Sequence, residues 1–261
     1  MKLGIEGKVA LVLGAAGGLG SAIAAELAAE GVRVAAAART ADRAEAVADR
    51  LRASGTPALG LGWDLADLGV ADDRIGRIEA ELGTVDILVN NTGGPPPGPA
   101  AGQTLETWRR YVDAMVLPVI AVTDRVLPAM RAQGWGRVIT STSSGVVAPI
   151  PNLGLSNALR ASLLGWSKTL AREVGPDGVT CNIVVPGRIA TARVRALDEA
   201  KAAREGRPVE SVVRESVASI PVGRYGDPRE YAQVVTFLAS MCSAFVNGSV
   251  IRVDGGMIPS I

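Results

Sequence analysis

"LVLGAAGGLGSAIAAEL" (residues 11–27) passes from an apolar β-type run into a helical pattern rich in alanine and leucine. Gly14, Gly18 and Gly20 mark the turn with the spacing Gly-x-x-x-Gly-x-Gly, and Leu19 lies between the last two. Glycine lets the backbone turn tightly and approach a phosphate, whose charge then lies at the positive end of the following helix. The segment therefore predicts a strand, a dinucleotide-binding turn and a helix, with a plain strand-to-helix turn as the alternative.

Outward from this segment, short β-type runs alternate with longer helical stretches, as in consecutive βαβ units on a parallel sheet. Seven strands are predicted, at residues 9–13, 32–38, 58–63, 85–90, 136–142, 179–185 and 249–253. Apolar residues three and four apart predict helices at 20–30, 42–53, 68–82, 105–133 and 155–174. Two segments break the alternation, the Gly- and Pro-rich residues 91–102 and the charged residues 188–216. We expect both segments to contact substrate.

Composition limits the classes of partner and chemistry. With 261 residues, 48% of them hydrophobic, the chain is predicted to fold as one domain over residues 1–261. Lys and Arg total 27 against 26 Asp and Glu, so the charge balance does not favour nucleic acid as a partner. The chain has no His, which excludes Ser-His triads and His-ligated metal sites, and we predict no metal. No stretch approaches about 18 uninterrupted apolar residues, so we expect no membrane contact and a cytoplasmic location.

The end of the second predicted strand indicates which dinucleotide is preferred. An acidic residue there would accept from the ribose 2′-hydroxyl and repel a 2′-phosphate, but the chain has Ala38 followed by Arg39. Because arginine donates bidentately to phosphate, we predict NADP, with NAD less favoured and a solvated arginine as the other interpretation. Gly17 supplies no second cation. Asp64, followed by Leu65, is positioned for the adenine amino group, although an aspartate there can also cap the next helix.

Five further stretches occur together in a recognisable order. They are "LGAAGGLG", "DILVNNTGG", "GRVITSTSSG", "SKTLAREVGPDGVTCNIVVPGRIAT" and "GRYGDPREYAQVVTFLAS…NGSVIRVDGG". Together they resemble the short-chain dehydrogenase/reductase family, of the type that includes 3-oxoacyl-carrier-protein reductases, over the whole chain. The resemblance implies a single Rossmann-like, doubly wound α/β domain with a seven-stranded parallel sheet, NAD(P) across the carboxyl ends of the strands, and a homotetramer. It implies these cofactor contacts: Asn91 and Gly93, with Thr92 where alanine is common, and Pro186, Gly187, Ile189 and Thr191 at the nicotinamide end.

The resemblance also implies a catalytic set of Asn, Ser, Tyr and Lys, and this chain keeps one of the four. In the family, Ser holds the substrate oxygen, Tyr is the acid or base, Lys lowers the Tyr pKa and holds the ribose, and Asn supports a water relay. The Ser position falls on Ser143, and the Tyr position, thirteen residues later, falls on Ser156. Counting back from "SKTLARE" gives the same register and puts Arg160 at the Lys position. The Asn position, seven residues after Trp108, falls on Met115.

These replacements change the chemistry expected of the site. A serine hydroxyl is a far weaker acid than a phenol, and arginine does not relay a proton near neutral pH. Ser156 and Arg160 are four residues apart and share a helix face, so both can project toward the nicotinamide ribose and the substrate. We expect Arg160 to hydrogen-bond the ribose or a carbonyl that develops negative charge. Water passing through the two serine hydroxyls is one proton source and Tyr111 is another, although packing is favoured for Tyr111.

Three hypotheses follow for function. The first is an NADP-dependent oxidoreductase acting on a carbonyl or alcohol through Ser143, Ser156 and Arg160. The second is a catalytically silent dinucleotide-binding protein, a sensor or assembly partner, and the third is a lyase or isomerase. Residues 188–216 lie where the family has its substrate lid, and their arginines suggest an anionic small molecule or a carrier-bound acyl group as substrate. A solvated amphipathic helix with interspersed Asp and Glu is the favoured interpretation of this segment. Its arginines are Arg188, Arg193, Arg195, Arg204, Arg207 and Arg214.

Overall fold

A computed structural model, which describes residues 2–261, has one parallel seven-stranded sheet in the order β3-β2-β1-β4-β5-β6-β7. Every predicted strand is present, and each boundary lies within two residues of its prediction. The strands are β1 (Val9–Val12), β2 (Arg33–Ala38), β3 (Ala58–Gly62), β4 (Ile87–Asn90), β5 (Gly136–Ser141), β6 (Val179–Pro186) and β7 (Val250–Val253). β1, β4 and β5, in the centre of the sheet, are buried along their whole length, as expected of a sheet covered by helices on either side, whereas β7 at the edge is partly exposed.

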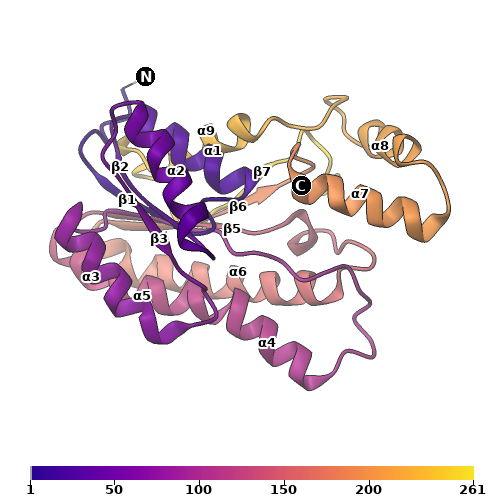
Figure 1. Cartoon of the computed structure of the whole chain (residues 1–261), viewed down its shortest axis with the longest axis horizontal. Helices are drawn as coiled ribbons and strands as arrows, with labels where there is room; N and C mark the ends of the chain where they lie inside the picture. The colour runs from indigo at the N-terminus through magenta and orange to yellow at the C-terminus, as the bar shows by residue number, and fades with distance from the viewer. Residues whose placement is uncertain (1) are drawn as a thin grey trace.

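Helices cover both faces of the sheet, which makes the fold doubly wound (Figure 1). One face packs against α1 (Gly18–Ala29), α2 (Ala41–Ala53) and α9 (Pro228–Leu238), with Ile23, Val47 and Val235 in a shared core. The opposite face packs against α3 (Ala71–Glu81), α5 (Leu117–Ala132) and α6 (Gly154–Val174), with Ile75, Val126 and Leu170 in a second core. The predicted α/β fold class is therefore confirmed. Within residues 2–261, no helix is long and apolar enough to cross a membrane.

The helix predicted over residues 105–133 is wrong as a single element. The structure has α4 (Leu105–Met115) and α5 as separate helices that meet at Val116. Pro118 explains the break, because it has no backbone N–H to donate to the carbonyl four residues earlier, and it is tolerated in the first turn of a new helix.

The charged segment 188–216 folds mainly into two helices, α7 (Ala192–Glu205) and α8 (Val209–Ala218). They project beyond the carboxyl end of β6 and away from the layered body of the molecule (Figure 1). Thr191 caps α7 by accepting a hydrogen bond from the Val194 amide, and Gly206 ends the helix in the left-handed region with φ +62°. The position of α7 and α8 is consistent with a substrate lid, which stays a prediction.

The strand order reverses between β1 and β4, and this point fixes where a site can form. The connection after β1 leads away to β2, and the connection after β4 leads in the opposite direction to β5. Loops leaving such a switch point diverge and leave a crevice at the carboxyl ends of the strands. The glycine-rich turn follows β1, and Asn91 follows β4, so both enter the same crevice.

Candidate active site

The glycine-rich turn after β1 is held in a shape that only glycine allows. Gly14 has φ +62°, and a Cβ at this residue would lie 2.4 Å from the carbonyl oxygen of Asn91. A Cβ at Gly20 would lie 2.2 Å from the carbonyl oxygen of Gly14, so the first turn of α1 packs directly on the loop. Such close backbone packing leaves the N-terminus of α1 and its amides facing the crevice, as a pyrophosphate requires.

Asn91 joins this turn to the end of β4. Its side-chain Nδ2 donates to the carbonyl oxygens of Leu13 at 3.2 Å and Gly14 at 3.4 Å. An added Cβ at Gly93, two residues on, would meet nothing within 4 Å, so the backbone there borders open space. The predicted residues Gly14, Asn91 and Gly93 thus come together at the mouth of the crevice, and their arrangement fits a dinucleotide.

Two arginines lie where the 2′-phosphate of NADP is expected. Arg39 follows β2 and is exposed, as the sequence predicts. Arg43, four residues later in the first turn of α2, donates from Nη2 to the carbonyl oxygen of Ala16 in the glycine-rich loop at 3.3 Å. Sequence reasoning missed this second cation because it looked only inside the loop. The available signal was a second arginine in the first turn of the predicted helix, close in sequence to Arg39.

We expect Arg39→Gln and Arg43→Gln each to weaken NADPH binding about tenfold, because each removes a charge-assisted hydrogen bond to phosphate worth roughly 1.5–3 kcal/mol. NADH affinity should stay unchanged, since NADH has no 2′-phosphate. Fluorescence titration with both cofactors measures the ratio. Arg50→Gln, an exposed arginine further along α2, is the matched control. Equal losses for NADH and NADPH would contradict the assignment.

Asp64 and Leu65 lie just beyond β3. The carboxylate of Asp64 is exposed and accepts from the Ala66 amide at 3.2 Å, which forms a turn. The alternative helix-capping role belongs to Asp67 instead, which accepts from the Gly69 amide at the start of the next helix. The second carboxylate oxygen of Asp64 has no hydrogen-bond partner within residues 2–261 and can still accept from an adenine amino group. Its role toward the cofactor therefore stays a prediction.

The segment after β6 closes over the glycine-rich turn. A Cβ at Gly18 would lie 2.6 Å from Cγ2 of Thr191, so the start of α7 rests directly on the start of α1. Gly187 is as tightly placed, since its Cβ would lie 2.5 Å from Cα of Asp254. Pro186 pairs with Val253 at the edge of the sheet, and the buried Ile189 bridges to Gly226. The predicted residues at the nicotinamide end therefore lie beside those at the pyrophosphate end.

Arg160 donates to three backbone carbonyls. Its Nη2 contacts the carbonyl oxygens of Thr92 at 3.1 Å and Gly93 at 2.8 Å, and its Nη1 contacts that of Ser141 at 3.4 Å. The side chain, which is 9% exposed, therefore ties α6 to the carboxyl ends of β4 and β5. Burial lowers the pKa of Arg160 to about 10, so the guanidinium remains cationic at neutral pH. Its predicted contact with ribose or substrate is not tested by these bonds.

Ser143 and Ser156 lie at the same end of the sheet. Ser143 follows β5, is partly exposed, and accepts from the Gly145 amide at 3.2 Å, so its hydroxyl hydrogen is free to point at a ligand. Ser156, 7% exposed, makes no side-chain hydrogen bond within residues 2–261. The neighbouring Asn157 holds the intervening loop by donating to the Ile150 carbonyl at 2.9 Å and accepting from its amide at 3.3 Å. Asn157 was not singled out from the sequence.

Met115 and the three tyrosines differ in whether they could transfer a proton in the site. Met115 is buried at the end of α4 and brings no polar group. Tyr231 is fully buried, with its hydroxyl 2.8 Å from the Ser141 Oγ, and burial raises its pKa. Tyr225 donates to Asp198 at 2.8 Å. Only Tyr111, part-exposed on α4, is near the site without such a structural bond to the core.

Most cationic side chains of the predicted lid are already paired with carboxylates. Arg188 pairs with the buried Asp198, and Arg207 pairs with Glu205 at 2.7 Å and with Glu215. Arg204 also contacts Glu205. These pairs agree with the interpretation of α7 and α8 as charged helices that stabilise themselves, so the number of arginines in the segment is not itself evidence for an anionic ligand.

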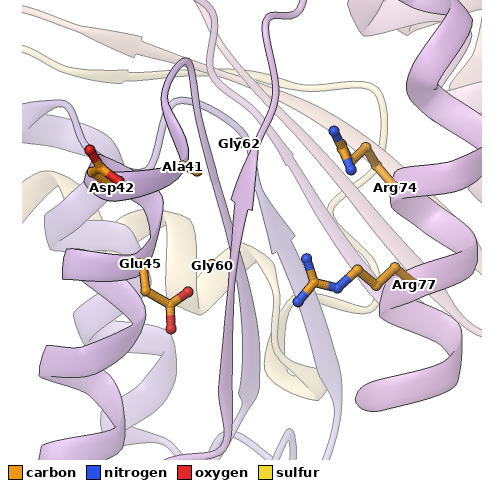
Figure 2. Close-up of a pocket in the computed structure, with 7 residues that line it drawn as sticks. All are labelled: Ala41, Asp42, Glu45, Gly60, Gly62, Arg74 and Arg77. Atoms are coloured by element: carbon orange, nitrogen blue, oxygen red, sulfur yellow. The ribbon is translucent and has the colours of Figure 1, made fainter.

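A separate groove of about 350 Å³ lies along β3, on the outer edge of the sheet. Figure 2 shows Arg74 and Arg77 of α3 reaching toward this strand, with Glu45 of α2 on the other side. The floor consists of Gly60 and Gly62. The groove contains none of the residues predicted for the cofactor or for catalysis, and the predicted site lies instead at the carboxyl ends of β1, β4 and β5. Within the described part of the chain, no cluster of three or more metal-ligating side chains is present.

Comparison with known proteins finds similarity over the full length. A family model described as enoyl-(acyl carrier protein) reductase matches residues 14–258. The 3-oxoacyl-[acyl-carrier-protein] reductase FabG of Escherichia coli (strain K12) is 38% identical over 98% of this chain and 99% of its own length. Acetoacetyl-CoA reductase of Rhizobium meliloti (strain 1021) is 37% identical over 95% and 98%. The structure of L-sorbose reductase from Gluconobacter frateurii, complexed with NADPH and L-sorbose, superimposes with a TM-score of 0.94 at 31% identity, covering all of both chains.

Proposed function

Because the chain belongs to the short-chain dehydrogenase/reductase family, we propose that it reduces a carbonyl substrate through a site formed by Ser143, Ser156 and Arg160. The chain is an NAD(P)-dependent oxidoreductase acting on C=O or CH–OH groups, as are its relatives. The observation that carries the proposed site is the position of Arg160. This buried cation joins Ser141, two residues before Ser143, to Gly93, which borders the open crevice.

The cofactor is NADP, in agreement with similar structures that contain NADPH or NADP. We assign its pyrophosphate to the turn of Gly14, Gly18 and Gly20, and its 2′-phosphate to Arg39 and Arg43. When bound, NADPH supplies the hydride for the carbonyl carbon. The predicted contacts are Gly14, Gly18, Leu19, Gly20, Arg39, Asp64, Leu65, Asn91, Gly93, Arg160, Pro186, Gly187, Ile189 and Thr191, and we add Arg43 because it contacts the glycine-rich loop.

The chain's own residues stabilise the charge that forms on the substrate oxygen. We assign Ser143 to donate its free hydroxyl hydrogen to that oxygen, since its Oγ already accepts from the Gly145 amide. The fixed positive charge of Arg160 stabilises the developing alkoxide, and because the side chain is buried in a region of low dielectric constant, water screens this attraction little. A water molecule gives the proton, with the hydroxyl of Ser156 passing it on, because neither arginine nor serine is an acid near neutral pH.

A catalytically silent dinucleotide-binding protein remains the second candidate. The bonds from Arg160 to three backbone carbonyls favour it, because a guanidinium engaged in this way can serve structure alone. Measurement of NADPH oxidation with a broad panel of ketones, oxo acids and oxoacyl thioesters separates the candidates. Turnover of any member supports the reductase, and silence across the panel with proven NADPH binding supports the sensor.

Ser143→Ala should lower kcat/KM for the reductase about tenfold to a hundredfold, the loss expected for one hydrogen bond to a charged group of roughly 1.5–3 kcal/mol. NADPH affinity should stay within twofold, because the hydroxyl is assigned to the substrate alone. Steady-state kinetics and cofactor titration provide both values. Ser162→Ala, on the outer side of α6, removes a comparable hydroxyl and should change neither. Unchanged kinetics in Ser143→Ala would remove Ser143 from the mechanism.

We also infer a homotetramer and a small-molecule or carrier-bound acyl substrate. The relatives act on acyl groups attached to acyl-carrier protein or to CoA, as their names state. Several large apolar side chains remain exposed on the single chain, among them Phe245, Met241 and Val250 near β7. Burial of these side chains between copies would remove apolar surface from water. Light scattering of the purified protein measures the assembly.

A further inference from the structure

Two arginines from distant parts of the chain converge on Gly94. A Cβ at Gly94 would lie 3.5 Å from Nη2 of Arg193 and 3.6 Å from Nη2 of Arg160. Arg160 comes from α6, whereas Arg193 comes from the first turn of α7. The two cations therefore border the same small space above the loop that follows β4, next to the open crevice at Gly93.

Neither of these arginines has a carboxylate partner. Throughout residues 2–261, no ion pair includes Arg160 or Arg193, whereas Arg188 and Arg207 in the same lid segment are neutralised by Asp or Glu. Their hydrogen bonds go to neutral backbone carbonyls instead, including that of Pro95, which accepts from Nη2 of Arg193 at 2.7 Å. Two positive charges near each other and short of counter-charge form a ready site for an anion.

The two arginines have different capacity for a ligand. Both hydrogens of the Arg160 Nη2 are directed to the carbonyls of Thr92 and Gly93, so this nitrogen contributes charge rather than a free donor. Arg193 uses one of its five N–H groups to donate to the Pro95 carbonyl and is exposed at the protein surface. Partial burial of its guanidinium lowers the pKa of Arg193, and Tyr111 opposes that shift, so both α4 and α7 lie close to the space.

We propose that Arg193, with the charge of Arg160 behind it, binds a carboxylate on the substrate, so that the chain acts on free oxo acids. This inference rests on the proposed reductase function and names its substrate class. The planar guanidinium of Arg193 matches a carboxylate bidentately. An acyl thioester, in contrast, has no charge at that position and leaves both cations uncompensated.

The direct test compares two ligands that have the same ketone but differ in the charge of the neighbouring carboxyl group. Acetoacetate carries a carboxylate beside its ketone, and ethyl acetoacetate carries a neutral ester there. Calorimetric titration of the NADP⁺-bound protein measures binding without turnover, because the oxidised cofactor cannot reduce either ketone. We expect acetoacetate to bind at least tenfold more tightly than the ester.

Variants identify the residue responsible. Arg193→Gln should lower acetoacetate affinity at least tenfold and leave the ester unchanged, and Arg193→Lys should restore part of the difference as a point charge. Arg109→Gln removes an exposed arginine from α4, outside the proposed site, and should alter neither ligand. NADP⁺ affinity is measured alongside in every variant.

Three results would overturn the inference. The first is equal affinity for acetoacetate and ethyl acetoacetate, and the second is an equal loss of affinity for both ligands in Arg193→Gln. The third is a loss of affinity for NADP⁺ alone in Arg193→Gln, which would assign Arg193 to the cofactor phosphates. Failure of the proposed function gives other signs. Absence of NADP⁺ binding contradicts the cofactor site itself. Charge-selective binding that depends on Arg193 but never leads to NADPH oxidation with acetoacetate or other oxo acids supports the anion site and contradicts the reductase.

Discussion

Gly14→Ala should abolish measurable NADPH binding, with an affinity loss of at least about 100-fold. The substituted residue would carry the left-handed strain of φ +62°, and its Cβ would lie 2.4 Å from the carbonyl oxygen of Asn91. Since the nearest atom belongs to the backbone, the loop and the end of β4 must separate, which spreads the amides that face the pyrophosphate. Fluorescence titration with NADPH and thermal unfolding with and without cofactor measure the effect.

Gly134→Ala is the control for this prediction. Gly134 also has a positive φ, +69°, but an added Cβ there would meet nothing within 4 Å, and it lies in the loop between α5 and β5. It should share the backbone strain of about 1–2 kcal/mol and retain NADPH affinity. Stabilisation of Gly14→Ala by NADPH to the wild-type extent would show that the glycine-rich turn is not the cofactor site.

The second large effect is expected for Arg160→Leu. The substitution leaves the carbonyls of Thr92, Gly93 and Ser141 without their shared donor at the ends of two central strands. We expect the free energy of unfolding to fall by about 2–4 kcal/mol, the cost of several buried acceptors partly rescued by water. Reductase activity should fall more than about 100-fold, because the cation beside the substrate oxygen is lost as well.

Urea unfolding and NADPH-oxidation kinetics separate the two losses for Arg160. Arg160→Lys keeps the positive charge but has one side-chain nitrogen in place of the two that donate to the carbonyls. It should therefore retain more of the reductase activity than of the free energy of unfolding. Arg172→Leu, an exposed arginine near the end of the same helix, should change neither quantity. Full activity in Arg160→Leu would contradict a catalytic role for Arg160.

The sheet was predictable because most of its strands can be recognised from their composition. β1 and β4 are buried, largely apolar runs between turn residues, a pattern that does not depend on distant contacts. The division of α4 from α5 was harder to predict, since apolar spacing continues through Val116 and only Pro118 marks the break. Periodicity reports the face that a helix buries, not the continuity of its hydrogen bonds.

The site was predictable to the extent that its residues belong to local motifs. Gly14 and Asn91 follow strands, and the parallel sheet brings the ends of those strands together. Arg193 could be counted among the lid arginines, but the sequence could not distinguish it from Arg188. That difference arises from tertiary contacts, because Asp198 neutralises one and only Pro95 contacts the other. The acceptors of Arg160 were hidden for the same reason, since backbone carbonyls have no sequence signature.

The three carbonyls that accept from Arg160 also affect which substitutions the chain can accumulate during evolution. A change to the tyrosine and lysine that the family resemblance implies would need two substitutions, at Ser156 and Arg160, and we expect neither to be neutral alone. Lysine has a single side-chain nitrogen and cannot replace the two arginine nitrogens that donate to the carbonyls of Gly93 and Ser141. Tyrosine in place of the buried Ser156 would have to fit beside the Arg160 guanidinium. We therefore expect each single substitution to lower stability and the two positions to be coupled, which would make the pair of Ser156 and Arg160 difficult to exchange one residue at a time.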